Sequence, residues 1–166
     1  MIVTHTKVST IAEGGDSNLV RPSDWNANHT ITGNIAVRGA LVTKLSNQNI
    51  PSGVVTAVVF DSELYDTDSI HESVTNPSRL TVPAGVTYVR LVANTMWASN
   101  ATGERYAIMY KNGAESYTGL PIVRKQAIGS SESSLCSAIV AVTAADYFQL
   151  IVFQNSGGGV LLYTNP

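Results

Sequence analysis

From Gly39 onward the chain alternates short β-branched and aromatic runs with clusters of Gly, Pro, Asn and Ser. Runs of this length, bounded by turn-forming residues, are typical of β-strands. No stretch long enough for an amphipathic helix carries the 3.6-residue period. Many short strands without helices favour an antiparallel β-sandwich or jelly roll. The pattern predicts strands near residues 40–45, 54–60, 78–82, 86–97, 105–111, 114–118, 137–143, 147–154 and 159–164.

A hairpin turn is predicted in the sequence YKNGAE. Asn112 and Gly113 stand between two alternating segments, and this dipeptide favours the two positive φ angles of a two-residue type I′ turn. Pro83 and Gly85 mark a second turn, and the run SGGG separates the last two predicted strands. Such regular turn signals are expected in a sandwich of short strands.

The first 35 residues have a different texture. They keep no period of 2 or 3.6, and the stretch AEGGDSNLVRPSDWNANHTITG is dense in turn-forming residues with a few isolated apolar ones. A chain of 166 residues holds one well-buried core but is too short for two domains of ordinary size. We therefore expect an extended N-terminal arm over residues 1–38 and one folded domain over residues 39–166.

Composition narrows the classes of partner. Charged residues make up 13% of the chain, about half the usual share of roughly 25%, and a neutral polar surface suits subunits that cover much of one another. The net charge is -2 and the Lys and Arg residues are scattered, so no basic patch is expected for nucleic acid. The last twenty residues are uncharged but contain Gln149, Gln154 and SGGG, so no membrane insertion is expected.

The residue types of common active sites are sparse. Neither G-x-S-x-G, a P-loop nor H-E-x-x-H occurs, and His5, His29 and His71 are too far apart to suggest a metal triad. Cys136 is the single cysteine, which excludes an internal disulfide, and its apolar neighbours indicate a small buried side chain. We expect a non-enzymatic protein without cofactor or metal.

The acidic segment FDSELYDTDSIHE concentrates five carboxylates in a chain that is poor in charge. It begins a long connection, from Phe60 to Ser78, in which we expect no strand. One interpretation is a connection that packs its apolar side chains on the sandwich and turns its acids to water. A second is a calcium site using Asp66 and Asp68, although the EF-hand pattern is absent. The third, acid–base catalysis, needs a cleft that the sequence does not indicate.

Two groups of residues carry a resemblance to a known family. The first group consists of Phe60, Asp61, Glu63, Tyr65, Asp66, Ile70, His71, Ser78, Arg79, Leu80, Thr81, Ala84 and Gly85. The second group follows later in the chain and consists of KNG at residues 111–113, ADYFQLIVFQN and GVLLY. In this order the two groups resemble the C1q/TNF-like jelly roll found in bacteriophage virion proteins. One departure is that both Val86 and Thr87 precede Tyr88, where those relatives have a single residue before the aromatic.

The arm carries a second resemblance. HTKVSTIAEGGDSNLVRPSDWNANHTITG is similar to N-terminal segments that recur in phage structural proteins ahead of different C-terminal domains. An indole in such a segment has to bury itself on something else, either the chain's own jelly roll or a virion partner. The residues expected to anchor the chain to the virion are Val20, Arg21, Asp24, Trp25 and Ile31.

Together the resemblances imply a homotrimer on the virion surface, made in the host cytoplasm, with its arm on a major capsid or tail protein. We expect a capsid decoration protein or head fibre that displays the jelly roll outward. The alternative is a tail-fibre or tail-tip receptor-binding module that contacts a host-surface glycan or protein. A secreted C1q/TNF-like ligand of a cellular organism is disfavoured, because the N-terminus lacks the apolar stretch of a signal peptide and no collagen stalk is present.

Overall fold

The computed structural model describes residues 2–3, 29–30, 37–114 and 120–164. The chain divides into two compact units, Met1–Val37 and Arg38–Pro166. In the first unit, β1 (Ile2–Val3) pairs antiparallel with β2 (His29–Thr30). The second unit contains the sandwich, and its described residues form strands and turns without a helix.

Eleven short strands build the second unit, within the part of the chain that the structure describes. Every pairing between them is antiparallel. In chain order they are β3 (Ala40–Thr43), β4 (Gln48–Ile50), β5 (Thr56–Ala57), β6 (Ser62–Asp66), β7 (Leu80–Thr81), β8 (Tyr88–Trp97), β9 (Glu104–Lys111), β10 (Ile122–Gln126), β11 (Glu132–Ala141), β12 (Tyr147–Gln154) and β13 (Val160–Leu162).

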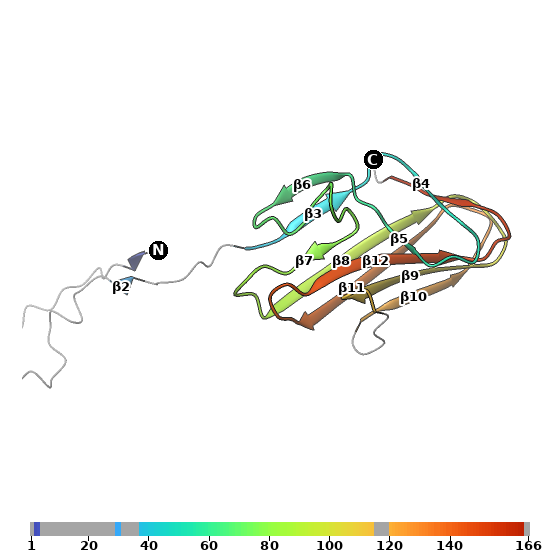
Figure 1. The fold of residues 1–166 in the computed structure, drawn as a ribbon. Helices are drawn as coiled ribbons and strands as arrows, with labels where there is room; N and C mark the ends of the chain where they lie inside the picture. Colours follow the sequence, from blue (N-terminus) through green and yellow to red (C-terminus); the bar gives the residue numbers. More distant parts are fainter. Residues whose placement is uncertain (1, 4–28, 31–36, 115–119, 165–166) are drawn as a thin grey trace, which may run out of the picture. The chain divides into compact units, whose positions relative to one another are not determined.

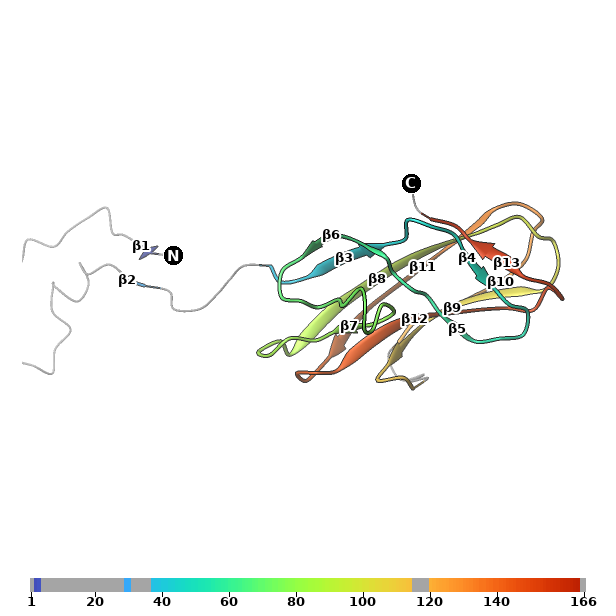
Figure 2. The ribbon, with the colours of Figure 1, turned by 45° about the horizontal axis from the view of Figure 1, so that its top comes forward.

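Nine of these strands form two facing sheets (Figures 1 and 2), and β3 pairs with β6 in a separate two-stranded sheet. One sheet has the order β11-β8-β13-β4, and the other has the order β10-β9-β12-β5 with β7 also paired to β12. The chain changes sheet between β8 and β9, between β10 and β11, and between β12 and β13. Such crossing between two antiparallel sheets is the jelly-roll arrangement. The expected fold class, an all-β antiparallel jelly-roll sandwich, is the one observed, and the C1q/TNF-like kind stays a prediction.

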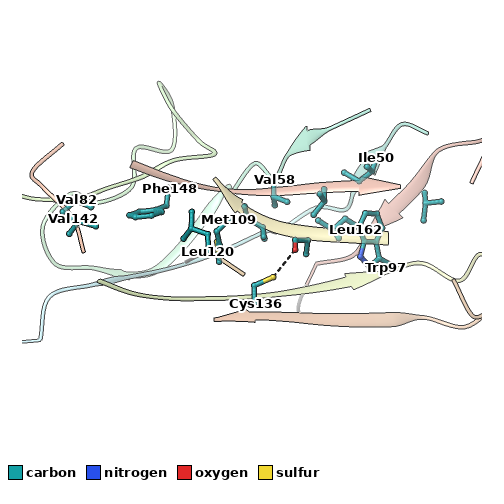
Figure 3. Close-up of a cluster of buried hydrophobic side chains, with 14 residues drawn as sticks. Ile50, Val58, Val82, Trp97, Met109, Leu120, Cys136, Val142, Phe148 and Leu162 are labelled. Atoms are coloured by element: carbon teal, nitrogen blue, oxygen red, sulfur yellow. Dashed lines mark hydrogen bonds between the residues drawn. The ribbon is translucent and has the colours of Figure 1, made fainter. Parts of the chain in front are cut away.

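The core lies between the sheets because the long strands alternate apolar side chains toward it. Phe148 extends inward from β12, and Trp97 and Cys136 extend inward from the opposite sheet (Figure 3). Trp97 is completely buried. The Cys136 thiol donates to the Ala107 carbonyl at 3.4 Å, and burial raises the pKa of this thiol. The expectation that Cys136 is a small buried side chain is confirmed.

Local patterns predicted some elements well. The strands expected at 86–97, 105–111 and 147–154 are confirmed to within two residues as β8, β9 and β12. Asn112 and Gly113 have φ angles of 55° and 74°, so the predicted positive-φ turn is also confirmed. The strand expected at 114–118 falls mostly outside the described residues.

Other elements were missed. β4, β6 and β10 were not predicted, and the expectation of no strand between Phe60 and Ser78 is wrong because β6 pairs with β3 there. β11 begins at Glu132 rather than near residue 137. Its early inward positions, Glu132 and Ser134, are polar although buried, and they interrupt the apolar alternation that marks a strand.

Candidate functional site: an apolar sheet face and the acidic segment

The predicted anchoring residues Val20, Arg21, Asp24, Trp25 and Ile31 lie outside the described residues. Their role on a virion therefore stays a prediction. The described residues contain two other features of functional interest, which are the acidic segment and the outward faces of the two sheets.

Asp66 closes a tight turn at the end of β6. Its Oδ1 accepts the backbone N–H groups of Asp68 at 3.1 Å and Ile70 at 3.0 Å, and its Oδ2 accepts that of His71 at 2.8 Å. Burial by itself raises the pKa of Asp66, but the three N–H donors together lower it by a larger amount. The pKa therefore lies below its usual value. The interpretation that the acids face water is wrong for this residue, which organises the chain around it.

Neighbouring carboxylates also have structural partners. Asp68 pairs with Arg38 through two hydrogen bonds of 2.7 and 3.0 Å, and Arg38 also donates to the Ala84 carbonyl at 2.8 Å. The hydrogen bond from Arg38 is the main cause that lowers the pKa of Asp68. Asp61 accepts the Leu45 N–H at 2.6 Å. These contacts join the segment to residues that precede it by sixteen or thirty positions.

Glu63 and His71 complete this group. His71 is buried, its Nδ1 lies 2.7 Å from Glu63 Oε1, and its Nε2 lies 3.2 Å from the Pro77 carbonyl. Among the described residues, no group of three His, Cys, Asp or Glu side chains is placed to hold a metal ion. Through the contacts of its carboxylates, the acidic segment fixes β6 and the turn that follows it.

The outward face of the sheet β11-β8-β13-β4 carries exposed apolar side chains. Each is between 39% and 73% exposed. We call this set the apolar sheet face, and it consists of Tyr88, Val92, Met96, Leu135, Ile139 and Leu161. Single exposed apolar residues are ordinary, but a contiguous group on one face marks an interaction surface.

The strand register places these side chains together. Val92 lies opposite Ser137 and Leu135 lies opposite Asn94, so the apolar side chains of β8 and β11 share one face of the sheet and are diagonal neighbours there rather than direct pairs. Arg90 is the one charged residue among the outward positions of β8 and β11. An apolar, nearly uncharged sheet face can be covered by another protein surface at little desolvation cost.

Sequence reasoning did not identify this face, although β8 contained a signal. In YVRLVANTMW the inward residues are apolar or small, as core packing requires, but Tyr88, Val92 and Met96 on the outward side are apolar as well. A strand that is apolar on both faces is typical of one that is covered on both sides.

The other sheet has a shallow hollow of about 310 Å³ on its outward face. Its wall includes Tyr106 and Phe153, whose rings lie 5.0 Å apart. The Arg124 guanidinium lies 4.6 Å from the Tyr106 ring and donates to Glu104 at 2.6 and 3.1 Å. The hydrogen bond from Arg124 is the main cause that lowers the pKa of Glu104. Aromatic walls beside a few fixed polar groups are features of small-ligand sites.

No model of a protein family matches the chain, and no curated protein matches it. Eighteen solved chains match. One is the crystal structure of murine APRIL at pH 5.0, with a TM-score of 0.42 and 11% sequence identity over 73% of this chain and 98% of that chain. The fold assignment rests on the strand order of the chain itself.

No helix in the described residues is long and apolar enough to span a membrane.

Proposed function

We propose that this chain is a non-enzymatic, homotrimeric structural protein of a bacteriophage particle. Its arm anchors it to a major capsid or tail protein, and its jelly roll is displayed outward as a capsid decoration protein or head fibre. The observation that carries subunit association is the apolar sheet face. The phage setting and the number of three subunits follow from the resemblance described above.

Burial of the apolar sheet face supplies the driving force for association. Fully burying one large apolar side chain is worth about 1.5–3 kcal/mol. Six side chains that are each roughly half exposed therefore offer several kcal/mol per contact, which is comparable to the lower estimates of the 4–15 kcal/mol lost on association. Few charges have to be desolvated at the same time, because Arg90 is the one charged outward residue of β8 and β11.

A matched pair of variants tests association. Leu135 on the face is 62% exposed, and Ile128, in the turn between β10 and β11, is 70% exposed. Leu135→Lys places a charge in the proposed contact, whereas Ile128→Lys adds the same charge away from it. By light scattering, wild type and Ile128→Lys are expected to have the mass of a trimer, about 53 kDa for three chains of 17.6 kDa. Leu135→Lys is expected to have the mass of a monomer. Wild type that is monomeric at micromolar concentration contradicts the proposal.

Anchoring by the arm is tested separately from trimer formation. Removing residues 1–33 cuts none of the strands β3–β13, so the truncated protein is expected to fold cooperatively and to form trimers. The same truncation should abolish incorporation into particles, and Trp25→Ala alone should weaken it. Truncated protein that unfolds or aggregates, together with a lower melting temperature for Trp25→Ala, would place the arm in the subunit's own core.

The hollow beside Tyr106 favours a second candidate function, a tail-fibre or tail-tip module that binds a host-surface glycan. Arg124→Ala removes a cation from this hollow. Arg79→Ala is a matched control, because the Arg79 guanidinium lies 4.2 Å from the Tyr147 ring outside it. Loss of host-cell binding in the first variant alone, with few copies per particle, would support receptor binding. Tens to hundreds of copies without host binding would support decoration.

A further inference from the structure

Strand β8 has one paired edge and one open edge. β11 pairs with β8 along its whole length, from Tyr88 to Trp97. On the opposite edge, β13 meets β8 at the single pair Leu162 and Trp97. Within the described ranges, no strand pairs with residues 88–96 on that side.

The backbone groups at the open edge can be identified from the contacts at its end. The Met96 carbonyl accepts the Tyr163 N–H at 2.8 Å, and the Ala98 N–H donates to the Leu161 carbonyl at 2.9 Å. Even-numbered residues of β8 therefore direct their N–H and C=O groups to the β13 side. Because these directions alternate along a strand, those of Arg90, Val92 and Asn94 point to the open edge. Such an edge is a template for pairing with another strand.

A groove runs along this edge. It is a cavity of about 360 Å³ between Arg90–Met96 on one side and Ala40–Lys44 on the other. β3 lies beyond the open edge of β8 in both ribbon views (Figures 1 and 2). The cavity reaches the apolar core between the sheets, at Phe60, Leu80, Met109, Phe148 and Leu150.

We propose that this groove binds one extended peptide segment of a partner protein, which adds to the sheet as a strand beside β8. Ala40–Lys44 of β3 and its end line the cavity opposite Arg90–Met96, so the open edge faces a walled cavity, and we take a single extended segment as its occupant rather than the edge strand of another sheet. The segment runs antiparallel to β8, because it continues the line of β13, which is antiparallel to β8. This inference does not depend on the trimer or on the phage setting.

The groove also defines the chemistry of its occupant. In an added strand, every second side chain faces the cavity floor, which is apolar, so those positions carry apolar residues. The charged residues that line the groove are Lys44 and Arg90. Lys44 donates to the Val59 carbonyl, and Arg90 makes no ion pair among the described residues. Both charges are positive, so the occupant is an alternating apolar and polar segment that carries an acidic residue.

The probe is an end-blocked peptide in which valine alternates with threonine and the last residue is aspartate. Binding is expected to slow amide hydrogen exchange at Arg90, Val92 and Asn94. Asn94→Pro removes one N–H from the open edge and none from the β11 ladder, so it should weaken binding at least about tenfold. Asn94→Ala is the matched control, because it keeps the N–H, and it should change affinity less than about twofold.

A charge exchange gives a second test that does not require a proline in β8. Arg90→Glu should weaken binding of the peptide that ends in aspartate and strengthen binding of a peptide that ends in lysine. Three results would overturn the proposal. These are absence of peptide binding at millimolar concentration, equal binding by Asn94→Pro and Asn94→Ala, and protection of the three amides in the protein alone at concentrations where it self-associates. The last result would assign the edge to a second copy of this chain.

Discussion

Replacing Asp66 with alanine is expected to destabilise the jelly roll strongly, although this residue belongs to a segment on the surface of the domain. The side chain accepts three backbone N–H groups, from Asp68, Ile70 and His71. Alanine leaves all three without their acceptor. Asparagine keeps one oxygen but presents an NH₂ group where one carboxylate oxygen stood, so it should have an intermediate effect.

The magnitude follows from the kind of bond that is lost. Hydrogen bonds to a charged group contribute about 1.5–3 kcal/mol each. Water can replace part of this at a half-buried site, so we expect a total loss of about 2–4 kcal/mol for Asp66→Ala and about half of that for Asp66→Asn. In a domain of this size the alanine variant should melt roughly 6–12 °C below wild type.

The dependence on pH gives an independent check. The folded-state pKa of Asp66 lies below its usual value, so its contribution to stability is complete above the unfolded-state pKa of about 3.9. The contribution is lost as the pH falls through the lower, folded-state pKa. In urea titrations, the gap in unfolding free energy between wild type and Asp66→Asn should therefore be constant above about pH 5 and should narrow below about pH 4.

Glu72 provides the control. It is an exposed carboxylate in the same acidic segment, and Glu72→Gln should change the unfolding free energy by less than about 0.5 kcal/mol. If Asp66→Ala melts within about 2 °C of wild type, or no more than Glu72→Gln does, the three N–H bonds do not stabilise the fold. The structural role assigned to this carboxylate would then be wrong.

Two further predictions concern the jelly roll itself. Gly103→Ala should destabilise the domain by about 3 kcal/mol or more, because φ is +78° and a Cβ would overlap Asn155 Oδ1 and lie 2.8 Å from the Asn155 backbone carbonyl. Gly157→Ala, with φ of +90° but open space, should cost only about 1–2 kcal/mol in chemical denaturation; equal losses would contradict the steric argument. The buried Cys136 thiol, whose pKa is raised by burial, should react with a thiol reagent only at the rate of unfolding, and rapid labelling of the native protein would refute its burial.

The long strands could be read from the sequence. β8, β9 and β12 are runs rich in β-branched and aromatic residues that end at turn-forming residues, so the residues themselves mark them as strands. The Asn112 and Gly113 turn was equally local, because its residues tolerate positive φ. β6 was different, since Leu64 and Tyr65 are both exposed and the strand exists through its pairing with β3.

The candidate sites divide in the same way. The sequence showed that residues 60–72 are rich in carboxylates, but not that Asp68 meets Arg38 or that Asp61 meets Leu45, because those partners come from far along the chain. The early start of β11 was hidden by polar residues that are buried.

The sequence by itself therefore determined the all-β class, the two layers and the scarcity of charge, since these depend on composition and on a two-residue period. Tertiary structure decided which faces of the strands remain exposed and which edge remains unpaired. The apolar side chains of β8 look alike in the sequence, yet Leu91 packs on the core and Val92 is exposed. Among the described residues, β13 pairs with β8 at Trp97 alone, which leaves the rest of that edge of β8 open. Strand register and strand length relative to a distant partner set both features. The exposed face leaves one local signal, the apolar residues on both sides of β8, and the open edge leaves none.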